Sequence, residues 1–149
     1  MRERAPPPEA VSPVAISADT VTLQGEFALP TQAGGVVLFA HGSGSSRHSP
    51  RNTYVAGVLR EAGLGTLLFD LLTTAEDRDY ATRFDIPLLT SRLVAATQWI
   101  LRETPATALP IVPGATHLFE EPGTLEQVAA LAADWFVRWL GARGRTLNS

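Results

Sequence analysis

The chain has 149 residues, a length typical of one domain that buries roughly 70% of the surface of its unfolded chain. With 45% hydrophobic and 18% charged residues it has the composition of a globular protein, and its net charge of −3 excludes the strongly basic surface typical of proteins that bind nucleic acid or anionic lipid. The absence of cysteine excludes disulfides, thiolate metal sites and thiol catalysis.

The first 13 residues contain four prolines and few apolar side chains, which predicts a flexible tail. They carry charges and prolines where a signal peptide needs an apolar run, and no later run approaches the length of a membrane-spanning helix. We therefore expect a cytoplasmic protein with no membrane partner. A second tail is predicted over residues 142–149, which leaves 14–141 as a single domain.

Strand patterns come first along the chain. Two short β-branched segments, 14–17 and 20–24, predict a hairpin with a two-residue turn. The apolar runs 36–40 and 66–72 show no polar alternation, which is typical of strands that are covered on both faces in a parallel sheet.

A predicted helix follows each of these two apolar strands. Ser49 can cap the first helix, and Gly63 suits the left-handed position that ends it. Asp85 begins the second helix, which runs through Arg102. The polar segment 73–83 before it predicts an exposed, charged loop. Strands that alternate with helices indicate right-handed crossovers onto a parallel sheet.

After residue 104 the sequence gives few signals of strands or helices. Segment 108–113 holds two β-branched residues between two prolines, so any strand there is expected to be short and to lie at a sheet edge. Thr124 and Gln127 form a capping box for a last helix that Gly141 ends. Its apolar residues predict a buried stripe: Leu125, Val128, Leu131, Ala132, Trp135, Phe136 and Trp139.

Together these elements predict an α/β fold. We expect a three-layer sandwich in which a mostly parallel sheet of four or five strands has helices on both faces.

Three segments resemble one family. The run 39–52, Phe-Ala-His-Gly-Ser-Gly-Ser-Ser-Arg-His-Ser-Pro-Arg-Asn, resembles the strand-to-helix segment of dienelactone hydrolase-like α/β-hydrolases. Segment 67–73 is similar to the following strand of that family, and segment 113–123 to its histidine loop. The segments occur in family order and span most of residues 14–141. The resemblance implies a reduced α/β-hydrolase fold and a small ester or lactone as substrate, with no cofactor and no metal.

The resemblance also implies site residues. It assigns the general base to His117 and an oxyanion-binding backbone N–H to Ser43. The attacking serine of such enzymes lies on a G-x-S-x-G elbow, and no five-residue window of this chain matches that pattern. The elbow and the loop with the catalytic acid should fall between about Ala108 and Ile111, where the sequence instead passes directly to the histidine loop. The pattern is that of an internally truncated hydrolase, and we expect weak or no activity.

Other residues could replace the missing groups. Ser45 or Ser46 could serve as a nucleophile if the histidine loop approaches them, and Asp70 could orient His117 as a replacement acid. The alternative is that the serines form a tight solvated turn and that Asp70 binds backbone in the following loop.

The glycine-rich loop also permits other interpretations. A turn of this kind can bind phosphate through its N–H groups, although the lysine of a P-loop is missing. His41, His48 and Asp70 could suggest a metal, but their spacing fixes no site.

A non-catalytic function is the competing hypothesis. If central strands are missing, the strand 36–40 needs a new neighbour, and an exposed sheet edge can recruit a second copy of the chain. A homodimer, or a poorly soluble deletion product, would follow.

Overall fold

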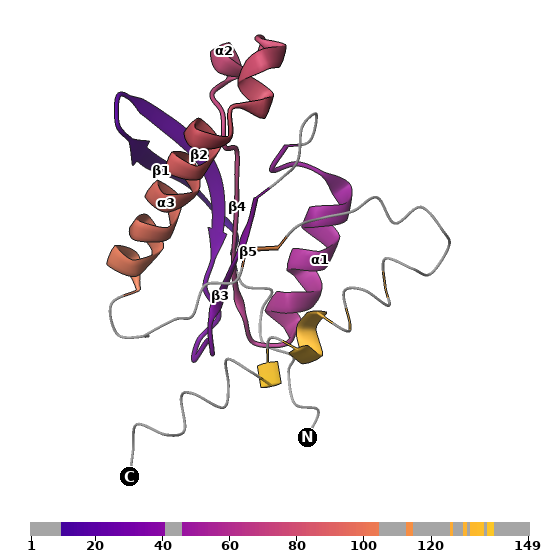
Figure 1. Ribbon diagram of the computed structural model, residues 1–149. Helices are drawn as coiled ribbons and strands as arrows, with labels where there is room; N and C mark the ends of the chain where they lie inside the picture. Colours follow the sequence, from indigo (N-terminus) through magenta and orange to yellow (C-terminus); the bar gives the residue numbers. More distant parts are fainter. Residues whose placement is uncertain are drawn as a thin grey trace, which may run out of the picture.

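The computed structural model describes residues 10–40, 46–104, 113–114, 126, 130, 132–135 and 137–138 (Figure 1). The described strands form one sheet in the order β1–β2–β4–β3–β5. Their bounds are Ser12–Ala18 for β1, Val21–Ala28 for β2, Val36–Phe39 for β3, Gly65–Phe69 for β4 and Pro113–Gly114 for β5. None of the helices in these ranges is long and apolar enough to cross a membrane.

The sheet is mixed, so the expectation of a mostly parallel sheet is wrong in this detail. β3 runs parallel to both β4 and β5, but β2 pairs antiparallel with β1 and with β4. The predicted hairpin explains the difference. Its two-residue turn, in which Asp19 has a positive φ of 50°, reverses the chain, and β2 then lies against the outer edge of β4.

The segment after residue 104 contributes a strand at the sheet edge, as its prolines predict. β5 has only two residues, and Pro113 pairs with Leu38 while Gly114 pairs with Phe39. It therefore provides the second half of β3 with the neighbour that this strand was expected to need.

The two long helices lie where the sequence predicts them. α1 spans Pro50–Glu61 and α3 spans Ile86–Glu103. Asp85 caps α3 by accepting a hydrogen bond from the N–H of Leu88 at 3.1 Å, whereas Ser49 occupies the N-cap of α1 without a side-chain bond. Gly63, with φ of 85°, lies just beyond α1 in the left-handed conformation.

The predicted loop 73–83 is wrong, because this segment is helical. It contains α2 (Thr74–Asp77) and the 3₁₀ helix η1 (Tyr80–Phe84). Thr73 and Glu76 form a reciprocal capping box that begins α2. Thr-x-x-Glu is a helix-start signature, so the sequence already held the signal for this helix.

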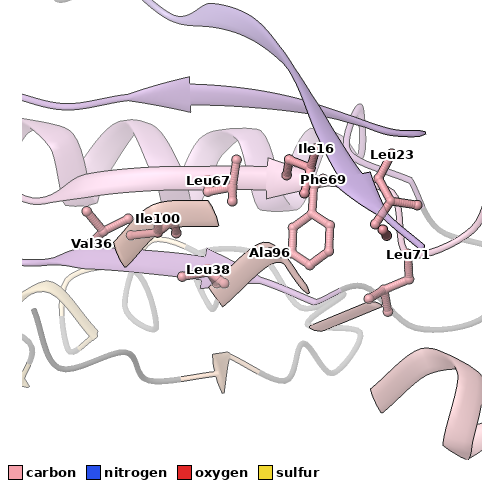
Figure 2. Close-up of a cluster of buried hydrophobic side chains, with 10 residues drawn as sticks. Ile16, Leu23, Val36, Leu38, Leu67, Phe69, Leu71, Ala96 and Ile100 are labelled. Atoms are coloured by element: carbon pink, nitrogen blue, oxygen red, sulfur yellow. The ribbon is translucent and has the colours of Figure 1, made fainter. Parts of the chain in front are cut away.

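Helices cover both faces of the sheet, as predicted. One face packs against α3 through Ala96 and Ile100, in the cluster shown in Figure 2: Ile16, Leu23, Val36, Leu38, Leu67, Phe69 and Leu71. On the other face, Ala56 and Leu59 of α1 pack against Val37, Phe39 and Leu68. β3 and β4 are buried on both sides, which explains their uninterrupted apolar sequences.

The last predicted helix is described only in part. Residues 126, 130, 132–135 and 137–138 are helical, and Ala133 is buried in the α1 cluster. Trp135 is 49% exposed, so its assignment to the buried stripe is wrong. It lies two positions after Ala133, which turns it by about 200° to the opposite face of the helix. The stripe residues Leu125, Val128, Leu131, Phe136 and Trp139 lie outside the described residues.

Close packing at the start of β4 yields a stability prediction. A Cβ added at Gly65 would lie 2.9 Å from side-chain atoms of Leu29 and Val36 and 3.2 Å from the Ala28 carbonyl oxygen. We expect Gly65→Ala to lower the free energy of unfolding by about 1–3 kcal/mol, measured by urea denaturation. Gly34→Ala is the control, because a Cβ there meets nothing within 4 Å. Equal stability of the two variants would contradict this packing.

Candidate functional site

The carboxyl ends of β3, β4 and β5 meet at one edge of the sheet, because the three strands are parallel. This is the edge at which α/β sheets place their ligands. Among the predicted site residues, the structure describes Ser46 and Asp70. His117, Ser43 and Ser45, together with His41, lie outside the described residues.

Asp70 follows β4 directly and fastens the segment that leads into α1. Its Oδ1 accepts a hydrogen bond from the backbone N–H of Arg47 at 2.8 Å, and its Oδ2 forms an ion pair with the Arg47 guanidinium. The N–H of Asp70 donates to the carbonyl oxygen of Gln24 in β2 at 3.0 Å. Asp70 thus binds backbone in the loop after β3.

Ser46 belongs to a turn that precedes α1. Its Oγ accepts a hydrogen bond from the N–H of His48 at 3.2 Å, and its carbonyl oxygen accepts one from the N–H of Ser49 at 3.0 Å. The His48 side chain is exposed, with Nδ1 3.7 Å from a carboxylate oxygen of Glu26. The serine oxygen therefore has a structural use in the turn. Sequence reasoning overlooked Arg47 and Glu26, since each contacts a partner more than 20 residues away.

A second charged pair lies beside this edge. Arg92 of α3 donates to both carboxylate oxygens of Glu76 in α2, at 3.0 and 2.7 Å. Arg92 is buried, and sequence reasoning did not foresee its partner. The hydrogen bond from Arg92 is the main cause that lowers the pKa of Glu76 below its ordinary value. The pair fastens α2 to α3.

Within the described ranges the site contains a backbone segment and an arginine that Asp70 holds in place. It contains no nucleophile next to a base. Its arginine is held by Asp70, and its serine oxygen accepts a hydrogen bond within a turn. No group of three or more metal-ligating side chains occurs in the same ranges.

Solved structures include a close relative. The chain is 34% identical to the dienelactone hydrolase from Anabaena variabilis, with a TM-score of 0.73 over 88% of this chain and 98% of that one. The chain belongs to the dienelactone hydrolase-like family of α/β-hydrolases. The resemblance of its motifs to this family is thereby confirmed.

More distant structures share the α/β-hydrolase fold alone. An esterase from an Arctic intertidal metagenomic library is 16% identical, with a TM-score of 0.61 over 90% of this chain and 60% of the esterase. A lidless α/β serine hydrolase from Xanthomonas campestris is 19% identical, with a TM-score of 0.57 over 89% of this chain and 60% of that one. No family model matches the sequence.

Two curated relatives come from Mycobacterium tuberculosis, strains CDC 1551 and H37Rv. Each is named "Putative phosphoribosyl transferase" and is 36% identical over 217 residues, which cover 94% of this chain and 49% of the relative. The chain thus spans about half the length of these relatives. The 217 positions exceed the 149 residues of the chain by 68, so at least 68 positions of each relative have no counterpart here.

The anchoring role of Asp70 can be tested by substitution. Asp70→Ala leaves the Arg47 guanidinium and N–H without their acceptor, and we expect it to lower the free energy of unfolding by about 1–3 kcal/mol. Asp77→Ala, which breaks the more exposed pair with Arg83, serves as the control and should cost about 0–1 kcal/mol. Urea denaturation measures both changes. Hydrogen exchange at the Arg47 amide should accelerate in Asp70→Ala alone; unchanged exchange would contradict the anchor.

The Glu76–Arg92 pair predicts a pH dependence. Because the folded-state pKa of Glu76 is lowered, its stabilising contribution is complete above the unfolded pKa near 4.5 and disappears as the pH falls through the folded value. Glu76→Gln should therefore destabilise the protein at neutral pH, with a difference from the wild type that shrinks in acid. Unfolding measured between about pH 7 and about pH 3 tests this sign. A difference that stays constant with pH would refute it.

Proposed function

We propose that this chain keeps the fold of an ester- or lactone-hydrolysing enzyme while its own hydrolysis is weak or absent. The observation that carries the proposal is the lack of any G-x-S-x-G window in the chain. The family resemblance places the elbow strand directly after the helix 86–103. In the structure the next described element is β5, which pairs with β3 and leads toward the histidine segment.

Triad chemistry supports this interpretation. The base removes a proton from the nucleophile and the acid orients the base, so a base with nothing to activate does not transfer acyl groups. By resemblance, His117 would be that base and the Ser43 N–H would bind the oxyanion. An oxyanion hole and binding alone can leave about 10³–10⁴-fold catalysis over water. That remainder requires a formed pocket, which the missing strands would have shaped.

The comparisons favour an internal gap as the origin of the loss. The mycobacterial relatives contain at least 68 positions within the matched stretch that this chain lacks. We place the gap between α3 and β5, because the family's elbow and acid loop are expected there.

The transferase name of the mycobacterial relatives is not carried over to this chain. It describes proteins about twice as long as the region that matches. The chain aligns with almost the whole length of a dienelactone hydrolase. We therefore propose that the name reflects the half of those proteins that has no match here.

A non-catalytic, self-associating module or a deletion product is the second candidate. β5 pairs only with Leu38 and Phe39, so in the described part of the sheet the first half of β3 has no neighbour on that side. Such an edge can pair with another chain.

Active-site labelling tests the proposed loss of hydrolysis. The folded chain is exposed to a fluorophosphonate and its intact mass is measured, beside His117→Ala, Ser46→Ala and an unrelated intact serine esterase. We expect no adduct on this chain, because no serine is activated. Cooperative unfolding of the same chain is the check that it is folded.

Stoichiometric labelling that disappears in His117→Ala would overturn the proposal and reveal an unorthodox nucleophile. Loss of the label in Ser46→Ala would identify that serine, whereas retention would point to Ser43 or Ser45.

A further inference from the structure

The segment between β4 and α3 adds nothing to the hydrophobic core. Residues 73–84, which contain α2 and η1 and which we call the β4–α3 segment, are all exposed or half-buried, and none belongs to either hydrophobic cluster. Figure 1 shows α2 beyond the carboxyl end of β4, at the edge of the sheet that holds the candidate site. A segment with so little buried apolar surface is held in place by its polar contacts.

The aromatic side chains of this segment do not attach it to another element. Tyr80 and Phe84 are 69% and 54% exposed, and their rings contact each other edge to face at 5.1 Å. Both rings belong to η1, so their contact stays within the segment. Helices as short as α2, with four residues, and η1, with five, are not stable in isolation. Their order therefore depends on whatever joins the segment to the rest of the chain.

One ion pair makes that connection. In the described part of the chain, the side-chain hydrogen bonds of residues 73–84 stay within the segment, apart from those between Glu76 and Arg92 of α3. The Oε2 of Glu76 accepts from the N–H of Thr73, which begins α2, and both carboxylate oxygens accept from Arg92. A single carboxylate thus caps α2 and fastens it to α3.

The charge of Glu76 decides whether this ion pair exists. Arg92 is the charged group that faces Glu76 from another element, and an arginine keeps its charge at every relevant pH. The remaining charged residues of the segment are exposed or have partners inside it: Asp77, Arg78, Asp79 and Arg83. None of them can replace the pair when Glu76 becomes neutral.

We propose that the Glu76–Arg92 pair is a latch, and that the β4–α3 segment opens as one unit when the pair breaks. Both ends of the segment stay attached to the folded chain, because Leu71 is buried in the cluster beneath α3 and Asp85 caps α3. The residues next to these attachments serve as hinges. The segment borders the edge of the candidate site, so its opening changes access to that edge. The latch is closed at neutral pH and released by acid.

Hydrogen exchange of the full chain, followed at single amides by NMR, tests the latch. The N–H groups of Asp77, Asp79 and Thr82 donate to carbonyl oxygens within the segment, whereas that of Asp70 donates to β2. At neutral pH we expect Glu76→Gln to lower the protection of the three segment amides at least about tenfold, because the neutral side chain no longer forms the ion pair. The Asp70 amide should remain protected.

Two further variants separate the latch from the capping of α2. Arg92→Met removes the ion pair but leaves the bond from the Thr73 N–H to Glu76, and it should lower the protection as much as Glu76→Gln does. Asp77→Asn is the matched control, because it neutralises a neighbouring acid whose partner lies inside the segment. It should change the protection less than about threefold. Circular dichroism shows that each variant is folded.

Urea and acid distinguish local opening from unfolding of the whole chain. Opening an exposed segment uncovers little surface, so low urea concentrations should leave exchange in the segment unchanged while they accelerate exchange in β4. Arg92 lowers the pKa of Glu76, so the latch holds until the pH falls through that lowered value. Below it, the protection in the wild type should match that in Glu76→Gln, whose own protection should change little.

Two results would overturn the inference. In the first, the segment amides accelerate with urea in parallel with those of β4, so that the segment opens only when the whole chain unfolds. In the second, protection falls in Glu76→Gln but not in Arg92→Met, so that Glu76 acts through the cap of α2 alone.

The latch and the proposed loss of hydrolysis fail separately. Neither Glu76 nor Arg92 is among the residues that the family resemblance assigns to catalysis. Fluorophosphonate labelling of a chain whose segment opens would refute the loss of hydrolysis but not the latch. An unlabelled chain whose segment amides exchange only together with β4 would refute the latch alone.

Discussion

The parallel pairing of β3 with β4 and β5 determines the rest of the structure. It directs the segments after these strands to one edge of the sheet, where family members carry their chemistry. It also places β3 and β4 inside the sheet, with both faces buried, so each face needs a helical layer. α1 and α3 supply these layers from opposite sides. The site and the core therefore depend on the same strand order.

Two carboxylates that follow β4 connect the sheet to the elements that cover it. Asp70 binds Arg47 in the segment that enters α1, and Glu76 binds Arg92 in α3. Arginine stays charged at every relevant pH, so burying it requires an acceptor close by. In both pairs the acid follows β4 in the chain. The arginine comes from another segment, Arg47 from the one that enters α1 and Arg92 from α3. The exit of β4 is thus tied to both faces of the sandwich.

The elements that sequence predicts well are those whose signals are local. The hairpin, the two buried strands and the two long helices follow from periodicity and end signals within a few residues. The antiparallel pairing of β2 with β4 is a contact between residues more than 35 positions apart, and no local pattern encodes it. The Arg47–Asp70 bond spans 23 residues and was missed for the same reason. Trp135 shows another limit, because an apolar pattern without a known helix phase does not tell the buried side from the exposed one.

Fold and chemistry draw on different parts of this chain. Ala133 aside, the buried residues of both hydrophobic clusters lie before residue 105, most of them in β1 to β4, α1 and α3. In the family pattern, the nucleophile, the acid and the base all come later. A gap after α3 would therefore remove the reactive groups while leaving most of the core in place.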